Sequence, residues 1–235
     1  MSYILCFQVS AVLSICYLKF FCKDKFLIYS KSNSMENREI LRNQLARKYD
    51  KHDKEIIEAR KKSEILEKHK EIYHNNVSYN SGNCWINKKI SNSLELDDTD
   101  KNIYSSIINA QELVGNLSYP INLFHGFEKY TMYKDKQWQI GDIIPFQHAL
   151  SKTPSFTIAN TFAKDYNWPG SLFWSKYLFV KYPEGSKHIC IDIRLRYDEY
   201  EYLRANENLK LVDICYALEL STLNLHKFYV FDSEF

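Results

Sequence analysis

Residues 197–203 read Tyr-Asp-Glu-Tyr-Glu-Tyr-Leu, a charged stretch that runs into an apolar segment. Its two glutamates, Glu199 and Glu201, are separated by one residue. Alternate residues of an extended chain point to the same side, so both carboxylates are expected on one face at the start of a strand. Taken alone, such a pair is typical of a solvated strand face. It becomes informative through two motifs that precede it in the chain.

The first of these motifs is His125-Gly126, which ends an apolar, β-prone segment. The second is Ser151-Lys-Thr153, which is followed by a helical pattern that includes Phe162. A histidine beside a glycine is usually structural, and a Ser-x-Thr sequence is usually a turn or a helix cap. The order of the three motifs along the chain is therefore a stronger signal than any one of them.

The chain from about residue 75 onward predicts more strand than helix. Strands are expected over 121–124, 172–181, 187–194, 209–214 and 227–231, which are rich in Ile, Val, Phe and Tyr. A helix is expected from Asp100 to Val114, with Thr99 or Asp98 as its N-cap and Gly115 at its end. No βαβ alternation and no glycine-rich dinucleotide fingerprint appears, so the pattern predicts an α+β domain.

Read together, the three motifs resemble the ADP-ribosyltransferase superfamily, in its toxin-like branch with an Arg/His, Ser-x-Ser/Thr, Glu-x-Glu arrangement. The resemblance covers roughly residues 100–214. It implies a core of two packed, mostly antiparallel sheets, here with an N-terminal helical region. Two departures are notable: His125 stands where this branch usually has arginine, and Lys152 is unusual between Ser151 and Thr153. Lys152 is expected either to weaken the strand or to contact the phosphates of NAD.

The resemblance also implies a reaction and a role for each motif. NAD would be the co-substrate, without a metal ion, and Glu201 would stabilise the positive charge that develops on the ribose as nicotinamide leaves. Ser151 would orient Glu201, and Glu199 would position the acceptor. The residues implied in binding NAD are His125, Gly126, Thr153 and Phe162. His125 would bind a ribose hydroxyl or the diphosphate, and Gly126, lacking a Cβ, would approach the nicotinamide amide.

The expected acceptor is a protein arginine, because a glutamate at the place of Glu199 accompanies arginine acceptors in the family and a carboxylate pairs with guanidinium through two hydrogen bonds. A nucleic-acid acceptor stays open. So do three other functions: an inactive relative that binds a partner, an NAD glycohydrolase, and a membrane-tethered interaction protein. If the charge on His125 matters, activity is expected to change at about pH 6 to 7.

Composition excludes several classes of protein. The 235 residues are 45% hydrophobic and carry a formal net charge of +2, whereas a protein that coats nucleic acid would be strongly basic. None of the six cysteines forms a C-x-x-C pair, so a zinc ribbon is not expected and a reducing compartment is favoured. The seven histidines lack the ligand spacing of a metallohydrolase such as H-E-x-x-H.

The N-terminal part of the chain allows several interpretations. Residues 3–22 form the most apolar window, about long enough to cross a bilayer, although Lys19 lies within it. They are interpreted as an anchor that leaves the protein facing the cytoplasm, as sequence upstream of a true start at Met35, or as a buried or disordered extension. The expected location is accordingly the cytoplasm, or the cytoplasmic face of a membrane if residues 3–22 insert.

Three regions are therefore expected: the apolar segment 1–34, a charged helical segment 35–74, and an ADP-ribosyltransferase-like domain 75–235. Residues 36–72 carry 20 charged side chains and neither glycine nor proline. Their thin apolar stripe at helical spacing predicts a solvated helix that lies on the following domain. A coiled-coil or partner-binding segment is the alternative.

Overall fold

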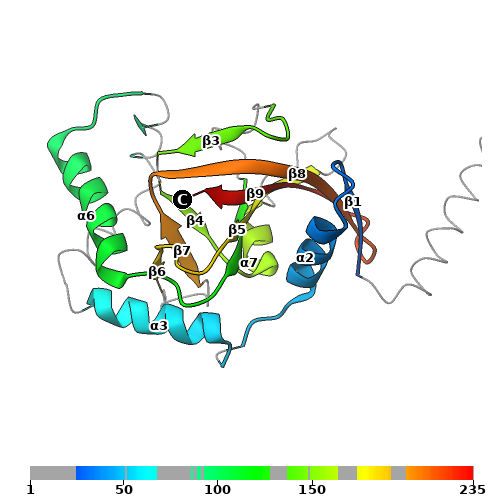
Figure 1. The fold of residues 1–235 in the computed structure, drawn as a ribbon, viewed down its shortest axis with the longest axis horizontal. Helices are drawn as coiled ribbons and strands as arrows, with labels where there is room; N and C mark the ends of the chain where they lie inside the picture. Colours follow the sequence, from blue (N-terminus) through cyan, green and yellow to red (C-terminus); the bar gives the residue numbers. More distant parts are fainter. Residues whose placement is uncertain are drawn as a thin grey trace, which may run out of the picture.

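A large and a small β-sheet, with helices around them, form the protein (Figure 1). The computed structural model describes residues 25–50, 52–67, 86, 89–90, 93–127, 137–147, 149–163, 174–191 and 200–234. Within these residues the helices are α2 (Met35–Ala46), α3 (Lys54–Glu67), α6 (Asp98–Val114) and α7 (Phe156–Ala163). The strands are β1 (Phe26–Ser30), β2 (Ile121–Gly126), β3 (Ile143–Phe146), β4 (Leu150–Lys152), β5 (Trp174–Tyr182), β6 (Ile189–Ile191), β7 (Glu201–Arg204), β8 (Glu207–Glu219) and β9 (Leu225–Glu234).

The large sheet has the strand order β1-β8-β9-β5-β2, and β3 pairs with β8 outside this path. Only β5 and β9 are parallel among its paired strands. The small sheet has the order β4-β7-β6 and is antiparallel throughout. The expected α+β fold with two mostly antiparallel sheets is thus confirmed.

Apolar side chains pack on both faces of the large sheet. One face, which includes Phe124 and Phe228, packs against α2 and α7. The opposite face, which includes Leu178 and Phe231, packs against small-sheet residues such as Tyr202 and against α3. The alternation of side chains along each strand places successive residues in these two layers. We call them the helix face and the small-sheet face.

The charged segment forms two helices instead of one. Ser34 caps α2, because its side chain accepts a hydrogen bond from the amide of Asn37 at 3.1 Å. On α3, buried Lys62 donates to the carbonyl oxygens of Val114, Gly115 and Asn116 at 2.7, 3.0 and 3.1 Å. A cation at the carbonyl end of a helix is favourable, so Lys62 ties α3 to the end of α6.

The expected helix over residues 100–114 is confirmed as α6, but its predicted cap is wrong. Asp97 is the N-cap, and its side chain accepts a hydrogen bond from the amide of Asp100 at 2.9 Å. Thr99 and Asp98 lie inside the first turn. Gly115 ends the helix with φ of 70°, a left-handed conformation that glycine adopts without a steric cost.

The described residues include a strand, β1, that lies upstream of the boundary expected at residue 34. Strand β1 pairs with β8 along its whole length, from Phe26 opposite Glu219 to Ser30 opposite Cys215. Buried Ser30 also donates a hydrogen bond to Asp213 at 2.6 Å. Residues 3–22, interpreted above as an anchor, lie outside the described residues. Among the helices that the structure describes, none is long and apolar enough to span a bilayer.

Candidate active site

The two sheets meet at the strands that carry the first two sequence motifs. The amide of Phe124, in β2, donates to the carbonyl of Thr153 at 2.7 Å, and the amide of Thr153 donates to the carbonyl of Phe124 at 2.8 Å. These two residues form an isolated antiparallel bridge between the edge of the large sheet and the end of β4. His125 and Gly126 therefore lie immediately beside the Ser-Lys-Thr segment.

The third motif reaches the same junction through β7. Ser151 pairs with Leu203 and Lys152 pairs with Tyr202, so Thr153 and Glu201 are the next residues along these antiparallel strands. Cross-strand neighbours share a face of a sheet, which places Ser151, Thr153 and Glu201 on one side of the small sheet. Glu201 is only 6% exposed. The structure thus brings together three motifs that are far apart in sequence.

His125 makes the most specific contact at this junction. Its Nδ1 lies 2.7 Å from the carbonyl oxygen of Ser151. A carbonyl oxygen can only accept, so Nδ1 carries the proton and donates it, and Nε2 of the neutral ring is an acceptor. Burial lowers the pKa of His125 to about 4, against an opposing effect of the Ser151 hydrogen bond.

This pKa corrects the expectation of a change in activity at about pH 6 to 7, which assumed the ordinary pKa of histidine. The side chain of His125 is half-buried, and the positive charge of Lys152 lowers the pKa of the imidazole further. The imidazole is therefore neutral across the physiological range. Any ionisation of His125 belongs near pH 4.

Lys152 does not point toward NAD phosphates, and a weakening of the strand by Lys152 stays a prediction. It alternates with Ser151 and Thr153 and so points away from their side of the strand. Its ammonium group pairs with the carboxylate of Glu207, with both side chains fully buried. The hydroxyl of Tyr182 donates to the other oxygen of Glu207 at 2.6 Å. The strand is thus held by a buried ion pair, and Lys152 is directed into the core instead of toward NAD phosphates.

Local sequence did not indicate Glu207 or Tyr182 as neighbours of the site. The position of Lys152 is a usable signal for a buried partner, however, because Ser151 and Thr153 on either side of it face the opposite side of the strand. A lysine on the buried side of a strand requires a polar partner, such as a carboxylate. Which carboxylate supplies it depends on the pairing of β4 with β7 and on the turn into β8, which local sequence does not reveal.

Gly126 is required by packing. A Cβ at this position would lie 2.3 Å from the carbonyl oxygen of Ala159 and 3.1 Å from the Cβ of Ala163. Both neighbours belong to α7, so the absence of a side chain lets this helix lie directly on β2. This packing explains the glycine without a ligand, and its approach to nicotinamide stays a prediction.

The structure supports the roles of the remaining predicted site residues less directly. Thr153 is 6% exposed, and its hydroxyl accepts a hydrogen bond from the amide of Ser155 at 3.2 Å, in the turn before α7. Phe162 lies on α7 and is 43% exposed, so its contact with NAD stays a prediction. Glu199 lies outside the described residues. No group of three or more metal-ligating side chains occurs among the described residues.

Comparison with solved structures identifies the fold. Plx2a, an ADP-ribosyltransferase toxin from Paenibacillus larvae, superposes with a TM-score of 0.58 and 12% identity, over 80% of this chain and 100% of its own. BECa, an ADP-ribosylating toxin of a binary enterotoxin of C. perfringens, superposes with a TM-score of 0.52 and 16% identity, over 80% of this chain and 50% of its own. The enzymatic component C2-I of the C2 toxin from Clostridium botulinum superposes with a TM-score of 0.52 and 15% identity, over 70% of this chain and 43% of its own.

The chain thus has the fold of ADP-ribosyltransferase toxins, as the motifs indicated. It spans the full length of Plx2a but about half the length of BECa and less than half of C2-I. No protein-family model matches the sequence, and no curated protein matches it either.

Proposed function

We propose that the protein transfers ADP-ribose from NAD to an acceptor, with a protein arginine as the expected acceptor. The observation that carries this proposal is the meeting of His125, Ser151 and Glu201 where the two sheets join. The hydrogen bond from His125 to Ser151 and the pairing of β4 with β7 fix this arrangement. The toxin fold supports the same chemistry, and the related BECa structure contains NADH.

The burial of Glu201 suits the electrostatic role proposed for it. The bond between the ribose and nicotinamide breaks with its electron pair moving to the nicotinamide nitrogen, which leaves positive charge on the ribose. A fixed carboxylate placed where this charge develops stabilises the transition state, and more so away from water. Glu201 is 6% exposed at the start of β7, so we assign it this role.

The protonation of His125 selects between its two expected ligands. With the proton held on Nδ1 by the Ser151 carbonyl, Nε2 can only accept a hydrogen bond. A ribose hydroxyl can donate such a bond, whereas the oxygens of an ionised diphosphate cannot. We therefore assign His125 to a ribose hydroxyl of NAD. This assignment needs the neutral imidazole that the lowered pKa provides.

Ser151 positions this histidine through its backbone, because its carbonyl oxygen fixes the imidazole. Its side chain is exposed and shares a side of the small sheet with Glu201. We retain the proposal that the hydroxyl of Ser151 orients Glu201 when NAD is bound. Removing it by Ser151→Ala preserves the backbone contact, so NAD affinity should be maintained while the turnover number falls.

The test is the release of nicotinamide and the transfer of label from NAD to a guanidinium acceptor such as agmatine. Glu201→Gln should lower both rates by roughly 100-fold or more, the scale for losing an electrostatic stabiliser of a transition state. Glu184→Gln, at an exposed turn, is the matched control and should act as the unaltered protein. Equal rates for Glu201→Gln and the unaltered protein, or no release by the unaltered protein, would refute the proposal.

The same assay separates transfer from hydrolysis. Glu199 is proposed to position the acceptor, so Glu199→Ala should lose transfer to agmatine while it continues to release nicotinamide. If the unaltered protein releases nicotinamide and never labels a guanidinium, the NAD glycohydrolase alternative replaces the transferase.

A further inference from the structure

The small-sheet face of the large sheet is open at the end where β1 lies. Strand register aligns two rows of side chains across β1, β8 and β9. The rows consist of Leu27, Leu218 and Leu225, and of Tyr29, Tyr216 and Lys227. Since alternate residues of a strand face opposite sides, all six lie on one face, away from α2. We call this surface the open face.

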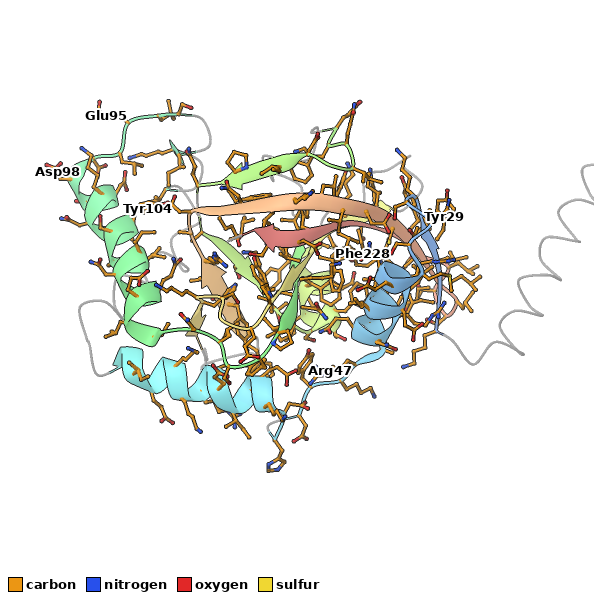
Figure 2. All side chains as sticks on the ribbon, viewed as in Figure 1. Tyr29, Arg47, Glu95, Asp98, Tyr104 and Phe228 are labelled. Carbon is orange, nitrogen blue, oxygen red and sulfur yellow. The ribbon has the colours of Figure 1, made fainter. Side chains whose placement is uncertain are left out.

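The open face exposes large apolar side chains. Leu27 is 36% and Tyr29 is 59% exposed, and Leu223, in the adjoining turn between β8 and β9, is 46% exposed. The rings of Tyr29 and Tyr216 stack with their centroids 6.3 Å apart. Figure 2 shows Tyr29 at the opposite end of the molecule from Glu95 and Asp98. Exposed apolar side chains thus lie on β1 and in the adjoining turn at one end of the protein.

The charged side chains on the open face and at the two ends of β1 are positive. The ammonium group of Lys227 lies 4.4 Å from the ring centroid of Tyr229 and 6.0 Å from that of Tyr216. Lys25 and Lys31 are exposed at the two ends of β1. Burial lowers the pKa of Lys227, and the nearby charge of Lys31 adds to this effect. A cationic rim around exposed leucine and tyrosine fits an anionic, apolar partner.

The apolar N-terminal segment joins the protein at this same end. Residues 1–24 lie outside the described residues and continue into Lys25. The carbonyl oxygen of Lys25 accepts a hydrogen bond from the amide of Leu220, in the turn that also carries Leu223. The window 3–22 is therefore connected directly beside the open face.

We propose that the open face docks on a membrane that contains anionic lipid, next to residues 3–22. Leucine side chains suit the boundary of the hydrocarbon, and tyrosines suit the level of the headgroups. Lysines near the surface attract anionic lipid. Single-stranded nucleic acid would also use tyrosine and lysine, but it offers no partner for the row of three leucines. The combination of side chains therefore favours lipid.

Docking through the open face would determine how far the candidate active site lies from the membrane. His125 pairs with Leu178, and Leu225 pairs with Trp174, four residues earlier on β5. Four residues of a strand span about 13 Å, and the two steps from β9 through β5 to β2 add roughly 10 Å across the sheet, so the site would lie on the order of 16 Å from Leu225. The docking itself requires neither NAD nor catalysis, and it stands or falls independently of the proposed function.

The test is flotation of the full chain with vesicles of phosphatidylcholine, alone or with phosphatidylserine. The protein should bind the vesicles that contain phosphatidylserine, and the triple variant Leu27→Ser/Tyr29→Ser/Leu223→Ser should bind at least about tenfold less. The matched control is Leu94→Ser/Leu113→Ser, which alters residues that are 58% and 38% exposed away from the open face. It should bind as the unaltered protein does. Melting temperatures verify that each variant is folded.

Charge is tested separately with Lys31→Gln and Lys227→Gln. Each should weaken binding about fivefold, the equivalent of roughly 1 kcal/mol for a lysine near an anionic surface, and added salt should remove the difference. Undiminished binding by the triple variant would overturn the proposal and assign binding to residues 3–22 alone. Equal binding to both kinds of vesicle, or binding to an oligo(dT) strand in preference to vesicles, would also overturn it.

Discussion

The Nδ1 of His125 lies 2.7 Å from the carbonyl oxygen of Ser151, so a side chain of the large sheet is fixed by the backbone of the small sheet. This contact joins two of the three sequence motifs and determines which ring nitrogen remains available. Because the bond orients a neutral imidazole with an accepting Nε2, the junction of the sheets is prepared to receive a hydroxyl group. The chemistry of the site depends on this arrangement.

The dependence of activity on pH follows from the pKa of about 4 for His125. The imidazole stays neutral above about pH 5, so the rate of nicotinamide release should not change through titration of His125 between pH 6 and 8. The rates of the unaltered protein and of His125→Gln should differ by a constant factor across this range. A change at about pH 6 to 7 that disappears in His125→Gln would contradict the assigned protonation state.

A methyl group at Gly126 should separate α7 from β2. Gly126→Ala places a carbon 2.3 Å from the carbonyl oxygen of Ala159, which is backbone and cannot rotate away. Overpacking of this kind costs about 1 to 3 kcal/mol, which urea unfolding would measure. A stable Gly126→Ala protein that merely binds NAD more weakly would show that the glycine serves the ligand and not the packing of α7.

The buried pair beneath the site should behave as a unit. Lys152→Met leaves the carboxylate of Glu207 buried without its cation, a loss of about 3 to 5 kcal/mol in the free energy of unfolding. The double variant Lys152→Met/Glu207→Gln keeps the hydrogen bond from Tyr182 and removes the charge, so it should recover much of this loss. A double variant whose loss equals the sum of the losses of Lys152→Met and Glu207→Gln, each measured alone, would show that the residues are energetically independent.

Local sequence predicted β2, β5, β6, β8, β9 and α6, because their apolar residues and the stop at Gly115 are encoded within a few residues, whereas β3 was not expected. The meeting of Phe124 with Thr153 could not be predicted, since it depends on the placement of two sheets and on register between distant segments. The motif order indicated the site only through its family resemblance. Strand β1 was missed because it follows the more apolar window 3–22, and its pairing with β8 spans most of the chain.

Asp213 should stabilise the attachment of β1 in a manner that depends on pH. Burial alone would raise its pKa, but hydrogen bonds from Ser30, Ser32 and Ile214 outweigh burial and lower the pKa below its ordinary value of 3.8. The ionised form is thus the one that the fold favours. Its contribution is present above the unfolded-state pKa and is lost as the pH falls through the lower, folded-state pKa.

Asp213→Asn should accordingly lower the free energy of unfolding by about 1 to 3 kcal/mol at pH 7, measured in urea. The difference from the unaltered protein should shrink below about pH 4. Asp98→Asn, which changes a fully exposed carboxylate, is the control and should alter stability by no more than about 0.5 kcal/mol. A difference for Asp213→Asn that persists unchanged at low pH would mean that ionisation of Asp213 does not stabilise β1.

The most direct measurement of the central claim is a crystal structure of the protein with a non-hydrolysable analogue of NAD. We expect the ribose next to nicotinamide at the junction of the two sheets, with the Glu201 carboxylate within hydrogen-bond distance, about 3 Å, of a ribose hydroxyl. We also expect Nε2 of His125 to accept from a ribose hydroxyl of the dinucleotide. An analogue bound elsewhere, or a Glu201 carboxylate turned away from the ribose, would contradict the assignment of this site.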